Sequence, residues 1–149
     1  MKILLIALLF LPLALSAQKV KLDDKTHIVT VDGVNSFIIE RFGCGFGLPD
    51  CHFDVHDLDS NKVIVINYKQ FNSPVERKPS NPDGRVDYFE FVFLKSGKKA
   101  EIDAGRIKSE KVAELMVKNK FFVAGKLNDQ AVDEFVLIHG TPFSQRVKF

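Results

Sequence analysis

The sequence lacks the features that define several large functional classes. After residue 17 it contains no apolar stretch long enough to span a bilayer, which takes about 20 residues. It has no Gly-x-Ser-x-Gly nucleophile motif, no glycine-rich phosphate loop before a helix and no Asn-x-Ser/Thr glycosylation site. Its 21 basic and 19 acidic side chains nearly balance, which gives no indication of nucleic-acid or anionic-membrane binding. No catalytic residue is predicted.

Residues 1–17 show the three-part pattern of a secretory signal peptide. Met1-Lys2 supplies one positive charge, Ile3–Leu15 an apolar run, and Leu15-Ser16-Ala17 a small-residue cleavage site. We expect cleavage after Ala17 and export to the periplasm or the exterior, with no transmembrane segment after processing. The remaining 132 residues, the 149 of the chain less these 17, are enough for one domain with its own core.

Cysteine is scarce, with only Cys44 and Cys51 in the segment GCGFGLPDC. In an exported protein, two cysteines this close in sequence indicate a structural disulfide. Closing so small a loop stabilises the fold by about 2–3 kcal/mol. A redox site is the alternative, but the spacing differs from that of the C-x-x-C motif.

Alternating apolar residues predict a series of antiparallel strands. The strongest signal is the hairpin Val86–Asp103, in which Phe89, Phe91 and Phe93 share one face. Because its first strand is apolar on nearly both faces, we expect it inside a sheet covered on both sides. Four earlier strands are predicted, at His27–Val31, Val34–Arg41, His52–Leu58 and Lys62–Tyr68. Asp32-Gly33 is expected to form a hairpin turn between the first two.

After Gly105 the apolar spacing changes from two residues to about 3.6, which predicts two helices. Ser109 is the expected N-cap of the first helix and Asn128 that of the second. In the second helix four residues are expected to face the core: Ala131, Val132, Phe135 and Ile138.

The order of these elements predicts the fold class. Strands grouped before helices indicate an α+β fold, with an antiparallel β-meander sheet of six or seven strands followed by two C-terminal helices packed on one face. The tail Phe143–Phe149 alternates again, as an additional edge strand would.

The segment His52–His56 carries a combination of possible metal ligands. Alternate residues of a strand share a face, so His52, Asp54 and His56 project together, away from Phe53 and Val55. Two imidazoles and a carboxylate suit zinc, and three ligands leave a position open for water. Against this, residues i and i+4 of a strand lie about 13 Å apart, and the outer face of an antiparallel sheet is ordinarily polar. We therefore expect that the protein has no cofactor, and a bound zinc ion is the alternative.

Residues Lys69–Arg85 are expected to form one long irregular connection, because the segment contains three prolines and a Pro-Asp-Gly turn. Prolines lower the entropy cost of holding an extended shape, and Arg77, Lys78 and Arg85 offer donors to a partner's carboxylates. A solvated connection without a binding role is the plainer interpretation of such a loop.

The second half of the chain resembles a family of small exported bacterial proteins of unknown function. The resemblance covers roughly Tyr88–Gly140 and consists of core and turn residues, in the segments FEFVFLKSGKKAEID, EKVAELMVKNK and LNDQAVDEFVLIHG. It implies bacterial export and nothing about activity. The cysteine loop and the histidine face of His52–His56 are not part of it.

Together these features favour an exported, non-enzymatic binding or structural domain. Its partner would be a protein, a glycan or an envelope component, engaged through residues 69–85. The alternative is a zinc-binding protein or zinc-dependent hydrolase that uses His52, Asp54 and His56.

Overall fold

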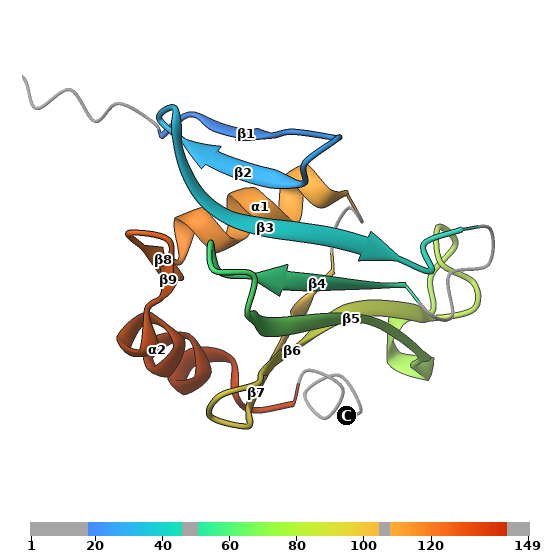
Figure 1. The fold of residues 1–149 in the computed structure, drawn as a ribbon. Helices are drawn as coiled ribbons and strands as arrows, with labels where there is room; N and C mark the ends of the chain where they lie inside the picture. Colours follow the sequence, from blue (N-terminus) through green and yellow to red (C-terminus); the bar gives the residue numbers. More distant parts are fainter. Residues whose placement is uncertain (1–17, 46–50, 105–107, 143–149) are drawn as a thin grey trace, which may run out of the picture.

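The computed structural model describes residues 18–45, 51–104 and 108–142, which form a seven-stranded antiparallel sheet followed by two helices (Figure 1). The strands lie in the order in which they occur along the chain, which confirms the predicted α+β meander. They are β1 (Val20–Leu22), β2 (Ile28–Val31), β3 (Val34–Phe42), β4 (His52–His56), β5 (Lys62–Asn72), β6 (Arg85–Phe93) and β7 (Lys98–Asp103).

The other elements surround or follow this sheet. A short 3-10 helix, η1 (Pro74–Glu76), lies between β5 and β6. After β7 come helix α1 (Ser109–Lys118), a small hairpin of β8 (Phe122–Val123) and β9 (Lys126–Leu127), and helix α2 (Asp129–His139). Among the described residues, no helix has the length and apolar character that crossing a membrane requires.

Two sequence predictions concern the ends of the chain. The predicted signal peptide, residues 1–17, and the predicted edge strand, residues 143–149, lie outside the described residues. The sheet also contains one strand that was not predicted from the sequence, the three-residue β1 with the sequence Val20-Lys21-Leu22. It pairs with β2 in the register Val20↔Val31 and Leu22↔Val29.

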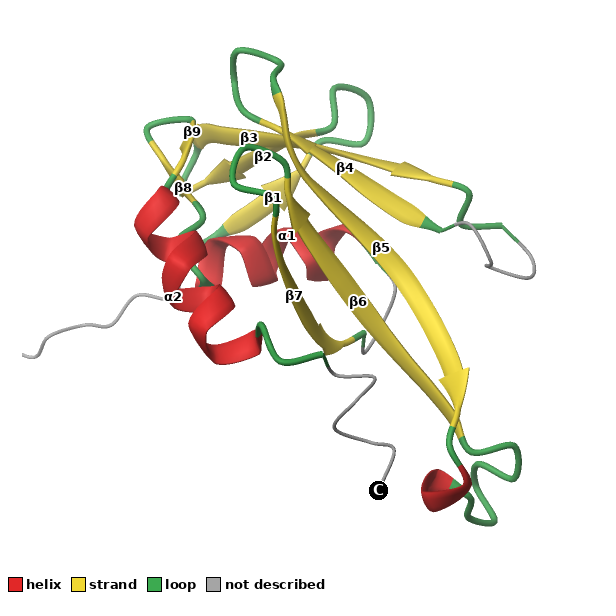
Figure 2. Ribbon diagram, turned by 90° about the horizontal axis from the view of Figure 1, so that it is seen from below, coloured by secondary structure: helices red, strands yellow, loops and turns green. Residues whose placement is uncertain are grey.

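The core lies between one face of the sheet and the two helices, which Figure 2 shows on the same side. Phe89, Phe91 and Phe93 of β6 are at most 3% exposed, and they meet buried residues of both helices in one cluster. The side chains on the opposite face of β6 are only half-buried. The expectation that this strand is covered on both sides is therefore wrong for the described residues.

The helix boundaries agree with the sequence in part. Asn128 caps α2 as predicted, because its side chain accepts a hydrogen bond from the Ala131 backbone N–H at 3.4 Å. The predicted cap Ser109 is instead the first residue of α1, and Lys108 occupies the cap position without a side-chain hydrogen bond. Ile138 was predicted to face the core but is 68% exposed, because it lies in the last turn of α2.

The β5–β6 hairpin is longer than predicted. β5 continues through residues 69–72, and these pair with the first four residues of β6, from Lys69↔Tyr88 to Asn72↔Arg85. Pairing extends this far because a complementary strand is available, and Phe71 packs edge-on against Tyr88 with ring centroids 5.9 Å apart. The irregular connection therefore shrinks from residues 69–85 to residues 73–84. Figure 2 shows this hairpin extending beyond the rest of the sheet, with η1 at its end.

Candidate functional site

The three predicted metal ligands lie on the outer face of β4, but each has its own neighbour. The His52 ring stacks on Phe42 with centroids 5.3 Å apart. The carboxylate of Asp54 forms an ion pair with the ammonium group of Lys62. The third ligand, His56, places its Nε2 atom 3.8 Å from a carboxylate oxygen of Glu40.

This arrangement does not gather the three side chains around one point. Among residues 18–45, 51–104 and 108–142, no group of three or more His, Cys, Asp or Glu side chains could hold a metal ion. A zinc ion at Asp54 would also have to compete with the Lys62 ammonium. The zinc interpretation remains a hypothesis.

The hairpin tip, residues 73–84, has a fixed backbone. The Asn81 side chain donates to the carbonyl oxygens of Glu76 at 3.3 Å and Arg85 at 3.0 Å, and its own oxygen accepts from the Arg85 N–H at 3.0 Å. The tip is closed at its base by a hydrogen bond of 2.8 Å from the Ser73 N–H to the Gly84 carbonyl oxygen. The tip is thus a folded structure rather than a loose connection.

Gly84 makes this closure sterically feasible. Its φ angle is +63°, in the left-handed region that favours glycine, and a Cβ atom at this position would lie 2.1 Å from the Ser73 carbonyl oxygen. Any side chain here would force Ser73 and Gly84 apart at the base of the tip.

The three basic residues predicted to bind a partner differ in their surroundings. Arg77 and Lys78 are exposed, and neither forms an ion pair with another described residue. Arg85 is already engaged, because its Nε atom donates to Asp87 at 2.7 Å and its guanidinium also donates to the Tyr68 hydroxyl. These two contacts, with Asp87 the stronger, raise the pKa of Arg85. The free cations of the tip are therefore Arg77 and Lys78.

A buried carboxylate joins the β4–β5 turn to the β8–β9 hairpin. Asp57, only 5% exposed, accepts hydrogen bonds from the Asn61 side chain at 3.0 and 3.1 Å and from the Asn61 N–H at 2.9 Å. The Lys126 ammonium lies 3.1 Å from the same carboxylate. The Asn61 side chain above all, and then its backbone N–H and Lys126, lower the pKa of Asp57 to about 2. The sequence placed Asp57 within the predicted strand His52–Leu58 and gave no sign of this contact, because Lys126 is 69 residues away along the chain.

The predicted disulfide is present, with the sulfur atoms of Cys44 and Cys51 1.95 Å apart. It connects the end of β3 to the start of β4, and the described residues contain no free cysteine. Cys51 is 1% exposed and belongs to the core cluster. The bond is compatible with an exported protein.

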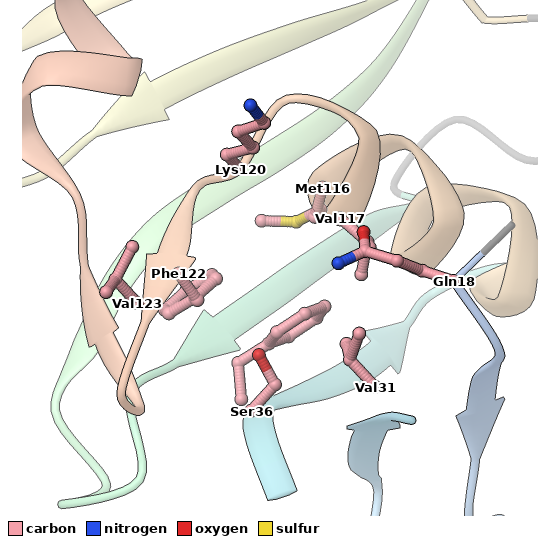
Figure 3. Close-up of a pocket in the computed structure, with 9 residues that line it drawn as sticks. Gln18, Val31, Ser36, Met116, Val117, Lys120, Phe122 and Val123 are labelled. Atoms are coloured by element: carbon pink, nitrogen blue, oxygen red, sulfur yellow. The ribbon is translucent and has the colours of Figure 1, made fainter. Parts of the chain in front are cut away.

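A cavity of about 260 Å³ opens between the end of α1, strands β2 and β3, and β8 (Figure 3). Its wall is mainly apolar, and the stacked rings of Phe37 and Phe122, with centroids 4.6 Å apart, form part of it. The polar groups of Gln18, Ser36 and Lys120 border it. Sequence reasoning missed this site, because its residues come from three separate stretches of the chain, at residue 18 and within residues 31–37 and 116–123.

Comparison with known proteins gives no match. No protein-family model, no curated protein and no solved structure matches this chain. The geometry of the described residues is therefore the basis for assigning a function.

Proposed function

We propose that this protein is an exported, non-enzymatic binding domain that engages its partner through the hairpin tip. One observation carries the proposal. The Asn81 side chain fixes the tip backbone, while Arg77 and Lys78 remain exposed without an ion pair among the described residues. A fixed backbone that presents unpaired cations is a form of preorganisation for binding.

The length of the connection supports a binding role. Two antiparallel strands can be joined by a two-residue turn, whereas residues 73 to 84 separate β5 from β6. Ordering a longer segment costs conformational entropy, and the hydrogen bonds of Asn81 offset part of that cost. A loop that only connected β5 to β6 would not require an ordered backbone of this length.

The chemistry of the tip indicates the kind of surface that it would bind. Val75 is 62% exposed, and the two free cations follow it along the chain after the half-buried Glu76. An apolar contact flanked by carboxylates or other anionic groups is complementary to this combination. A protein, an acidic glycan or another envelope component could supply such a surface.

The test is a capture experiment with a charge-matched control. The double variant Arg77→Glu with Lys78→Glu reverses both free cations of the tip. The control, Lys19→Glu with Lys21→Glu, makes the same charge change at exposed lysines in and just before β1. Wild type and both variants are immobilised in equal amounts, and binding from envelope extracts is quantified by mass spectrometry and glycan analysis.

We expect a component that the wild type and the β1 control both retain and that the tip variant loses at least fivefold. Equal capture by all three proteins would show that the cations of the tip do not take part in binding, which would contradict the proposal. Equal loss in both variants would show that only net charge matters. Asn81→Ala keeps the cations but loosens the tip, and it should weaken capture without changing the circular dichroism spectrum of the sheet.

The zinc alternative is separated by metal analysis of the same wild-type preparation. Near-stoichiometric zinc, together with a rise in melting temperature when zinc is added, would favour the face of His52, Asp54 and His56. Neither result is expected if the tip is the functional site.

A further inference from the structure

We infer that the cavity at the end of α1 binds a small carboxylate with an apolar tail, such as a medium-chain fatty acid. This site is separate from the hairpin tip and shares no residue with it. Its ligand class follows from the apolar wall and the polar groups at the border.

The wall of the cavity is suited to an alkyl chain. Phe37 and Met116 are fully buried and form its floor, and half-buried Val31, Val117 and Phe122 surround them. Figure 3 shows the thioether of Met116 and the ring of Phe122 facing the same space. Each methylene group that moves from water into such a site contributes favourably to binding.

The border of the cavity carries hydrogen-bond donors and a cation. Figure 3 shows the amide group of Gln18 reaching over the cavity and the Lys120 side chain at its edge. Lys120 is exposed and forms no ion pair within the described part of the chain. Because its ammonium sits on a flexible stem, it can move to a carboxylate at the mouth. No carboxylate side chain lines the described wall, so an anion would meet no acidic residue there.

The backbone conformation of Lys120 is set by the way in which α1 ends. The α1 C-terminus is a Schellman motif, in which the N–H of Lys120 donates to Val117 at 2.9 Å and the N–H of Phe121 donates to Met116 at 3.1 Å. The motif places Lys120 in the left-handed region, with φ of +54°. Glycine is the usual residue there, because any Cβ atom is strained in this conformation. Lys120 adopts this conformation, as four other non-glycine residues do, and its side chain lies at the border of the cavity.

The experiment uses the full-length gene product as the cell processes it, with octanoate as the probe. Met116 is the only methionine apart from Met1, so labelling the methionine methyl groups gives a single reporter within the cavity wall. Octanoate is titrated below its micellar concentration, and octylammonium, which has the same chain and the opposite charge, is the matched probe. We expect a saturable shift of the Met116 methyl signal with octanoate and at least tenfold weaker binding of octylammonium.

Variants then separate the role of Lys120 in binding from its role in the fold. Lys120→Gly should raise the melting temperature by relieving the backbone strain, and should weaken octanoate binding about three- to tenfold by removing the charge. Lys120→Gln should weaken octanoate binding similarly but should not raise the melting temperature. Lys118→Gln is the charge-matched control, because Lys118 is an exposed lysine nearby. The inference is overturned if octanoate leaves Met116 unshifted or does not saturate, if octylammonium binds equally well, or if Lys120→Gly binds octanoate as the wild type does.

Discussion

Replacing Asp57 by asparagine should remove a part of the stability that depends on pH. Asp57 accepts hydrogen bonds from Asn61 and interacts with Lys126, and its pKa falls from 3.8 to about 2 in the folded protein. A carboxyl group with a lowered folded-state pKa stabilises the fold above its unfolded-state pKa, and this contribution disappears as the pH falls through the folded-state pKa. The relevant window therefore runs from about pH 5 down to about pH 2.

The magnitude follows from the size of the shift. Each pKa unit corresponds to about 1.4 kcal/mol, so the shift sets an upper value of about 2.5 kcal/mol. Solvent screening at this turn reduces the expected effect, because the partner Lys126 is half exposed. We therefore expect Asp57→Asn to lower the free energy of unfolding by about 1–2 kcal/mol at pH 6 and by much less at pH 2.

Urea unfolding measured by circular dichroism between pH 2 and pH 6 checks this prediction. Asp24→Asn is the control, because Asp24 is an exposed carboxylate outside this network. The difference between wild type and Asp57→Asn should shrink as the pH falls, whereas the difference for Asp24→Asn should stay near zero throughout. A destabilisation by Asp57→Asn that is the same at pH 6 and pH 2 would refute the reasoning, because it would then arise from packing and not from the charge.

Three further predictions follow from the geometry. Gly84→Ala should lower stability by about 2–3 kcal/mol, clearly more than Gly97→Ala, because both glycines have positive φ but only a Cβ at position 84 would meet backbone. Phe91→Ala should cost about 3–5 kcal/mol in urea unfolding, whereas Leu94→Ala, 45% exposed, should cost less than about 1 kcal/mol. Replacing both cysteines by serine should lower the free energy of unfolding by about 2–3 kcal/mol. The intact mass of the wild type should be two hydrogens below that of the dithiol form. Alkylation of both cysteines without reductant would contradict the disulfide.

The features of the fold that could be predicted from sequence depend on local patterns. Period-two alternation identified β2 to β7, and the Asp32-Gly33 turn lies between β2 and β3 as expected. Asn128 was recognisable as a cap because capping is a contact between residues three apart. Cys44 and Cys51 were paired correctly because the chain contains only two cysteines and they lie close together in sequence.

The features that were missed depend on contacts distant in sequence. β1 has only three residues, in a stretch rich in charged side chains, and becomes a strand because β2 offers it an edge to pair with. The end of β5 looks irregular from its own residues, and its pairing is decided by β6. In the same way, the partner of Asp57 is Lys126, and the cavity combines three separate stretches of the chain. Local sequence patterns do not predict such contacts between separate segments.

The surroundings of Asp54 allow the two functional hypotheses, partner binding at the hairpin tip and zinc binding on β4, to be compared. Asp54 is only 7% exposed, and Lys62 neutralises it on the outer face of the sheet. A metal ion could use this carboxylate only by displacing the ammonium group, which would leave a cation without its partner beside the new ion. Arg77 and Lys78 face no such competition, because they have no ion pair to break among the described residues. Binding at the hairpin tip therefore requires no rearrangement of existing ion pairs, whereas zinc binding at the β4 face requires at least one.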